Sequence, residues 1–181
     1  MNIILATLNA KYIHTNLAIR YLKAAARPDF DPQLAEYTIK DPAFNIASDL
    51  FQKKPDVIGF SCYIWNIEET IKVIQMLKTV LPETKIFLGG PEVSYDSNHW
   101  LRKVPEIDYI IMGEGEVSFK ELLHYFNGDI PLNEVRGICY LQDGKFKVHA
   151  QPPKIDLREL PSPFRFEEDL PYLGKRIQYI E

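Results

Sequence analysis

Four of the nine glycines of this chain stand in two short motifs, each directly after an apolar run. GGP occupies residues 89–91, and GEGE occupies residues 113–116. Glycine permits positive φ, and it also lets a ligand lie close to the backbone. The carboxylates of the second motif, Glu114 and Glu116, could act as an acid–base pair. Because side chains at i and i+2 point apart on a helix, and helix N-termini favour acids, we expect Glu116 to cap a helix and leave the role of Glu114 open.

The other reactive side chains do not form a common type of active site. The four histidines are isolated from one another and no CxxC occurs, so no zinc site is expected. Cys62 and Cys139 lie in apolar runs, which is typical of free buried thiols in a cytoplasmic protein. Neither GxxxxGK[ST] nor GxGxxG follows the first apolar run, which argues against a phosphate-binding loop. The sequence therefore contains no common zinc-binding or phosphate-binding motif.

The composition is that of a globular protein. The chain has 181 residues, of which 46% are hydrophobic, with a net charge of −4 and a pI of about 5.6. This acidic balance argues against a nucleic-acid-binding protein that depends on a basic surface. No apolar run approaches the roughly 20 residues that cross a bilayer. The N-terminus also lacks the basic start and small-residue cleavage site of a signal peptide. We expect a cytoplasmic location, with neither nucleic acid nor membrane as a partner.

Strand-like and helix-like patterns alternate over the first 126 residues. Strands are predicted at residues 2–8, 33–39, 55–63, 84–90 and 107–113. Helices are predicted at residues 16–27, 41–54, 66–81, 94–104 and 114–126. Five such units predict an α/β fold: a doubly wound, five-stranded parallel sheet of flavodoxin-like or Rossmann-like type, with helices on both faces.

Three details of these helices are also predicted. Leu17, Tyr21 and Ala24 share one face of the first helix and should be buried. The second helix should have an Asp cap and Pro42 at its first position. Asn66 should cap the third helix.

The chain divides into three parts. Residues 1–128 form the α/β domain. Residues 129–150 contain a hairpin with Asp143-Gly144 at its turn, which we expect to extend the same domain. Residues 151–181 are proline-rich and irregular, except that RIQYIE at residues 176–181 has the pattern of a further strand.

Ligands of such sheets bind beyond the carboxyl ends of the strands. Three of the loops there contain SCYIWN, GGPEVS and GEGE, and these loops resemble those of the cobalamin-binding domain that precedes the catalytic domain of radical S-adenosylmethionine enzymes. IDLRELPSPF at residues 155–164 resembles the linker between those two domains, and residues 176–181 resemble the strand before the cluster-binding loop. The resemblance covers essentially the whole chain, and it lies in the order and spacing of the motifs.

The resemblance implies a cobalamin-binding module. The radical S-adenosylmethionine domain of the same polypeptide would be its partner and would hold a 4Fe–4S cluster and S-adenosylmethionine. The full-length protein would be a radical enzyme, for example a methyltransferase, and this part alone would be inactive. The implied cofactor-binding residues are Asn9, Tyr12, His14, Ser61, Cys62, Tyr63, Trp65, Gly89, Gly90, Pro91, Glu92, Gly113, Glu114 and Gly115.

Some of these residues have more specific implied roles. In the family, a small serine lines the slot for the nucleotide tail and a GG pair lets the tail pass the backbone, which assigns Ser61, Gly89 and Gly90. Aromatic side chains on the loops could pack on the corrin ring. The usual DxHxxG motif is absent around His14. We therefore prefer base-off cobalamin without a protein ligand on cobalt, with His14 as a non-standard axial ligand being the alternative.

Three other interpretations compete with this one. A flavin- or nucleotide-binding domain would favour a Ser/Thr-rich first loop, which here offers only Thr15 and Asn16. A signalling receiver domain would need acidic residues after the first and third strands, and neither loop has them. A domain that kept the fold and lost cobalamin is compatible with the missing DxHxxG motif.

Overall fold

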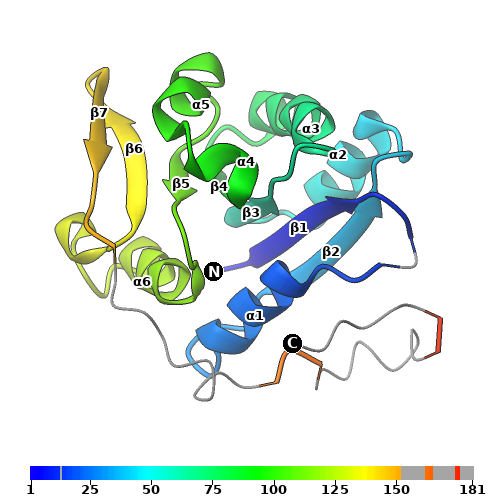
Figure 1. Cartoon of the computed structure of the whole chain (residues 1–181), viewed down its shortest axis with the longest axis horizontal. Coiled ribbons are helices and arrows are strands. Elements are labelled where there is room, and N and C mark those ends of the chain that lie inside the picture. The colour runs from blue at the N-terminus through cyan, green and yellow to red at the C-terminus, as the bar shows by residue number, and fades with distance from the viewer. Residues whose placement is uncertain (13, 152–161, 165–173, 176–181) are drawn as a thin grey trace.

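The computed structural model describes residues 1–12, 14–151, 162–164 and 174–175 (Figure 1). The strands are β1 (Ile3–Asn9), β2 (Gln33–Thr38), β3 (Val57–Ser61), β4 (Lys85–Gly89), β5 (Tyr109–Ile111), β6 (Ile138–Gln142) and β7 (Lys145–Val148). The helices are α1 (Leu17–Ala26), α2 (Ala43–Gln52), α3 (Ile67–Val80), α4 (Pro91–Ser94), α5 (Ser97–Lys103), α6 (Glu116–Asn127) and the short 3-10 helix η1 (Leu132–Glu134).

The strands form one mixed sheet in the order β2-β1-β3-β4-β5-β6-β7. Strands β1 to β5 are parallel, which confirms the predicted doubly wound α/β fold. Strands β6 and β7 form the predicted hairpin and pair antiparallel at the β5 edge. The sheet therefore has seven strands in all, namely the five predicted parallel strands and the two strands of the hairpin. Asp143 and Gly144 have φ of 51° and 71°, as the predicted two-residue hairpin turn requires.

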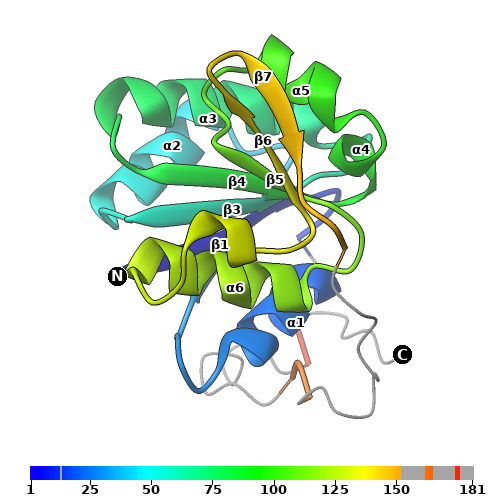
Figure 2. The same ribbon diagram turned by 90° about the vertical axis from the view of Figure 1, so that its left-hand side faces the viewer.

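Helices cover both faces of the sheet (Figure 2). Helices α1 and α6 lie on one face, and α2, α3 and α5 lie on the other. Because side chains alternate along a strand, β1 contributes to both cores. Ile4, Ala6 and Leu8 pack in the core under α2 and α3, whereas Ile3 and Leu5 pack in the core under α1 and α6. Burial on both faces explains why the central strands read as continuous apolar runs.

The buried face of α1 differs from the prediction. Leu17 and Tyr21 are only half-buried, whereas Arg20 and Lys23 are among the most buried residues of the helix. Their charges have partners, since Arg20 forms an ion pair with Glu36 of β2 and Lys23 lies 3.5 Å from a carboxylate oxygen of Asp31. Apolar periodicity alone could not indicate these buried charges.

Two predicted caps have other roles. The Asp41 carboxylate accepts hydrogen bonds from the backbone N–H and hydroxyl of Thr38, and the N-cap of α2 is Pro42. The Asn66 Oδ1 accepts from the backbone N–H of Tyr63, and its Nδ2 donates to the carbonyls of Leu8 and Ser61. Asn66 therefore ties the ends of β1 and β3 together and makes no side-chain cap on α3.

The segment predicted as one helix at residues 94–104 contains a break. Helix α4 ends at Ser94, and α5 begins at Ser97 with Asp96 as its cap. In the part of the tail that the structure describes, Pro163 is buried and the Phe164 ring centroid lies 5.7 Å from the Arg20 guanidinium carbon. The strand predicted at residues 176–181 lies outside the described residues, as does most of the predicted linker segment.

Two further observations concern the described residues. No helix among them combines the length and apolar character needed to cross a membrane. They also contain no group of three or more His, Cys, Asp or Glu side chains that could hold a metal ion. Cys62 and Cys139 are buried free thiols, as predicted.

Candidate functional site

A cavity of about 210 Å³ lies at the carboxyl edge of the sheet, between the strands and helices α1 and α6. It adjoins the point between β1 and β3 where the strand order reverses, which is where sheets of this type bind ligands. Pockets that enclose a whole drug-sized ligand measure about 300–1,000 Å³, so this cavity suits one end of a larger molecule. Eight of the predicted site residues line it: Ser61, Tyr63, Gly89, Gly90, Pro91, Gly113, Glu114 and Gly115.

The floor of the cavity is apolar. Leu5, Gly59 and Phe87 pair side by side in register across β1, β3 and β4. A Cβ on Gly59 would lie 2.0 Å from Cζ of Phe87, so the Phe87 ring rests directly on the glycine backbone. The ring also packs against Phe119 of α6, with a centroid distance of 5.3 Å. Gly59 thus makes room for an aromatic ring at the bottom of the cavity.

A second row of residues lies two positions nearer the carboxyl ends of the same strands. Here Thr7, Ser61 and Gly89 are paired in register. The Asn16 Nδ2 donates to the hydroxyl oxygens of Thr7 at 3.2 Å and Ser61 at 3.4 Å. Because an amide nitrogen only donates, the Ser61 oxygen accepts in this contact, which keeps its hydroxyl hydrogen for another acceptor. Ser61 is therefore arranged as a hydrogen-bond donor at the cavity.

The two adjacent glycines of the GGP motif have different reasons to be glycine. Gly90 has φ of 108°, and a Cβ there would lie 2.4 Å from the carbonyl oxygen of Cys62. The turn itself therefore requires Gly90. For a Cβ on Gly89 the nearest heavy atom would be the Ile111 carbonyl oxygen, at an ordinary 3.9 Å. Among the described residues, neither the turn nor side-chain packing requires a glycine at position 89, and the space beside Gly89 belongs to the cavity.

The two glycines of the GEGE motif also have different structural reasons to be glycine. Gly113 has positive φ of 70°. A Cβ on Gly115 would lie 3.1 Å from Leu22 Cδ2, so Gly115 allows α6 to lie close to α1. Glu116 is the first residue of α6, where the helix dipole favours its charge. Glu114 is exposed at the cavity.

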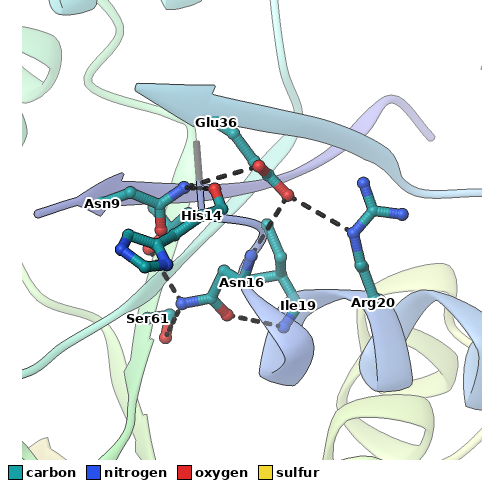
Figure 3. Close-up of polar contacts among 8 residues, drawn as sticks. Asn9, His14, Asn16, Ile19, Arg20, Glu36 and Ser61 are labelled. Carbon is teal, nitrogen blue, oxygen red and sulfur yellow. Dashed lines mark hydrogen bonds and ion pairs between the residues drawn. The ribbon is translucent and has the colours of Figure 1, made fainter. Parts of the chain in front are cut away.

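The loop from β1 to α1 is held by a buried polar network (Figure 3). The Asn9 Nδ2 donates to the His14 carbonyl at 3.0 Å and to a Glu36 carboxylate oxygen at 3.4 Å. The Asn16 backbone N–H also donates to Glu36, and the Asn16 Oδ1 caps α1 by accepting from the N–H of Ile19. Glu36 and Arg20 form an ion pair in which each side chain is only 5% exposed. Removing one partner of a buried ion pair is strongly destabilising for the protein, so Glu36 is held in place by Arg20. Through its contacts with Asn9 and Asn16, Glu36 in turn fixes the position of this loop.

The rim of the site carries exposed aromatic and apolar side chains. The rings of Tyr63 and Trp65 stack, with centroids 4.5 Å apart and planes 6° from parallel. Trp65 is 50% exposed and Tyr12 is 55% exposed, while Ile64 and Tyr95 are exposed still further. These residues follow β1, β3 and β4, which are neighbours in the sheet. Such side chains offer apolar area to a flat, wide ligand.

Six predicted site residues do not line the cavity: Asn9, Tyr12, His14, Cys62, Trp65 and Glu92. Tyr12 and Trp65 belong to the rim, and Asn9 and His14 belong to the loop network. Cys62 packs in the core on the opposite face of the sheet, where burial, with a contribution from the Glu92 carboxylate, raises the pKa of its thiol. Glu92 is half-buried, and its carbonyl accepts a hydrogen bond from Trp100 Nε1.

Several cavity residues were not predicted. They are Leu5, Ala18, Ile19, Leu22, Gly59, Phe60, Phe87, Ile111 and Glu116. Gly59 carried a usable signal, because a glycine inside a strand often marks the close approach of another group. The apolar members could not be distinguished from ordinary core residues by sequence. Asn16, which donates to both Thr7 and Ser61, was noted only as a polar residue of the first loop, and Thr7 was not singled out.

The fold and cavity together define a ligand-binding domain of the doubly wound α/β class. Residues 3–123 match the family described as B12 binding domain, so the chain belongs to the B12-binding domain family. TokK of Streptomyces tokunonensis, a cobalamin-dependent radical SAM methyltransferase, is 31% identical over 136 residues, which are 72% of this chain and 20% of TokK. An uncharacterized methyltransferase of Pyrococcus horikoshii is 26% identical over 149 residues, which are 81% of this chain and 32% of that protein.

A solved structure has the same fold. The cobalamin-dependent S-adenosylmethionine radical enzyme OxsB, with aqua-cobalamin and S-adenosylmethionine bound, matches 96% of this chain and 24% of OxsB with a TM-score of 0.80 at 20% identity. The chain thus spans between about a fifth and a third of the length of these proteins.

Proposed function

We propose that this chain binds cobalamin with its lower base off the cobalt, and that the nucleotide tail enters the cavity beside Gly89. The family match supports cobalamin as the ligand. Gly89 carries the assignment of the site, since its missing side chain leaves room that the residues described by the structure do not fill. The size of the cavity, about 210 Å³, suits the tail better than the whole cofactor.

The residues present fit the different parts of cobalamin. Ser61 offers a hydrogen-bond donor to the tail, while the apolar floor accepts its aromatic base. Tyr12 and Trp65 on the rim could cover part of the corrin ring. When bound, cobalamin supplies methyl-group chemistry at its cobalt, and the chain contributes binding and orientation. We propose no catalytic residue in this chain.

We further propose that cobalt receives no ligand from the protein. The loop lacks the DxHxxG pattern around His14. Electron paramagnetic resonance of bound cob(II)alamin tests this point. A spectrum without nitrogen splitting is expected, whereas splitting that disappears in His14→Ala would establish His14 as the axial ligand.

The role of the remaining chain is part of the same proposal. Residues 1–128 would be the cobalamin domain with 129–150 as its hairpin extension, and 151–181 would lead to a radical S-adenosylmethionine domain. That domain would hold the 4Fe–4S cluster and S-adenosylmethionine, and the whole would be a methyltransferase-like enzyme. The named relatives and the share of their length that this chain spans support this view. The free buried cysteines suit a cytoplasmic location.

A titration with hydroxocobalamin tests the proposed function. After desalting, we expect the corrin absorbance to stay with the protein, with a spectrum shifted toward the base-off form. Flavin mononucleotide, titrated in parallel, should be removed by desalting. Loss of cobalamin together with retention of flavin would replace the proposal by the flavodoxin-like alternative. Loss of both ligands would mean either that a radical S-adenosylmethionine domain completes the pocket or that this domain kept the fold without the cofactor. The same titration of the full-length protein separates these two outcomes.

A further inference from the structure

We propose that the cavity selects among corrinoids by their lower base, favouring a benzimidazole over a purine, and that Phe87 on Gly59 sets this selectivity. The inference rests on the proposed function, because it concerns the end of cobalamin that would enter the cavity. It adds the class of corrinoid that this chain would accept.

The floor offers no polar side chain to a base. Leu5, Ile19, Phe87 and Ile111 are between 1% and 3% exposed. The backbone groups of β1, β3 and β4 are engaged in pairing between the strands. Ser61, the donor described above, lies in the row nearer the carboxyl ends of the strands. The other polar side chains of the lining, Tyr63, Glu114 and Glu116, lie in the loops after the strands or at the start of α6. A ligand group that reaches the floor beside Leu5, Gly59 and Phe87 therefore meets mainly carbon.

The two classes of base differ at the edge that would reach this floor. In 5,6-dimethylbenzimidazole the ring fused to the imidazole carries only C–H and methyl groups. In adenine the corresponding ring carries two ring nitrogens and an amino group. Burying such groups without partners is unfavourable, because each loses its hydrogen bonds to water. The floor should therefore reject adenine and accept dimethylbenzimidazole.

Phe87 sets the depth of the cavity. The tip of its ring lies over Gly59 of β3, and the ring packs against Phe119 of α6, so it contacts two other elements of the fold. Close packing of this kind resists displacement. With the ring in place, a base cannot sink further to reach water or polar groups elsewhere. A smaller side chain at position 87 would leave space for water beside a purine and weaken the discrimination.

Equilibrium dialysis of the chain against three corrinoids tests the inference. The probes are cobalamin, the analogue with adenine as lower base, and cobinamide, which lacks the nucleotide. We expect cobalamin to bind at least about tenfold more tightly than the adenine analogue, which corresponds to one unpaired buried polar group. Cobinamide should bind more weakly than cobalamin, since it leaves the cavity unused.

Variants separate the role of Phe87 from a general loss of binding. Phe87→Leu keeps an apolar floor. It should reduce the ratio of the affinity for cobalamin to the affinity for the adenine analogue by at least about threefold. Phe44→Leu makes the same chemical change on the surface of α2, where Phe44 is 70% exposed, and should leave the ratio unchanged. Gly59→Ala should displace the Phe87 ring into the cavity and weaken cobalamin while sparing cobinamide.

The outcomes distinguish this inference from the proposed function. Equal affinity for the two base-bearing corrinoids would overturn the selectivity and leave cobalamin binding intact. A Phe87→Leu chain with the wild-type ratio would overturn the role of Phe87. If neither cobalamin nor cobinamide binds, the proposed function fails and this inference fails with it.

Discussion

The neighbouring residues Gly89 and Gly90 should respond in opposite ways to the same substitution. Gly90 has φ of 108° and ψ of 169°, a region that is essentially restricted to glycine. Occupying it with alanine costs about 1–3 kcal/mol. The added Cβ would also lie 2.4 Å from the Cys62 carbonyl oxygen, which belongs to the backbone and cannot easily move. We expect Gly90→Ala to lower the free energy of unfolding by about 3 kcal/mol or more.

Gly89→Ala should leave the free energy of unfolding within about 0.5 kcal/mol of wild type, because its Cβ would make only an ordinary contact at 3.9 Å. Gly128 provides a matched control, since it has φ of 86° and nothing within 4 Å of an added Cβ. Gly128→Ala should cost about 1–2 kcal/mol, the penalty of the left-handed backbone alone. The difference between Gly90→Ala and Gly128→Ala then measures the clash with Cys62.

Urea unfolding followed by circular dichroism gives these free energies, and retention of cobalamin after desalting gives the second readout. Gly89→Leu should fill the space beside the tail and abolish retention without lowering stability by more than about 1 kcal/mol. The reasoning is refuted if Gly89→Ala destabilises as much as Gly90→Ala. It is also refuted if Gly89→Leu retains cobalamin as well as wild type.

Three further predictions concern stability and the rim. Asn66→Ala should lower the free energy of unfolding in urea by about 2–3 kcal/mol, because it leaves buried backbone groups unpaired. Asn98→Ala on the surface should lower it by less than about 0.5 kcal/mol, and equal costs of the two substitutions would contradict the role of Asn66. Burial acts to raise the pKa of Asp49, but hydrogen bonds, including one from the Tyr37 hydroxyl, hold this pKa below its usual value. The ionised Asp49 carboxylate therefore stabilises the fold above the unfolded pKa of about 3.9, and this stabilisation is lost as pH falls through the folded pKa. Tyr37→Phe should therefore cost about 0.5–1 kcal/mol at pH 7, with a gap from wild type that narrows below pH about 4, and a gap independent of pH would refute this. Trp65→Ala should weaken the retention of cobalamin. It should lower the free energy of unfolding by less than about 1.5 kcal/mol, which is the upper value for losing the ring stack with Tyr63. Undiminished retention of cobalamin would show that Trp65 is not part of the site.

The sequence predicted the order of the elements well because each strand and helix has its own apolar period. It also predicted a ligand site at the carboxyl edge, because glycine motifs followed two of the strands, and a cavity lies at that edge. The hairpin turn at Asp143-Gly144 was predictable for the same local reason: its two residues tolerate positive φ. The buried charges of α1 were not predictable, because their partners Glu36 and Asp31 come from other elements.

What the sequence by itself determined was the fold class, the hairpin and the loops that could touch a ligand. Only the tertiary structure decided that Gly90 serves the turn while Gly89 faces the cavity. It also decided that Phe87 rests on Gly59 and that Asn16 holds the Ser61 hydroxyl. These relations depend on the register of neighbouring strands and on contacts between residues far apart in the chain, and no local pattern of residues encodes either.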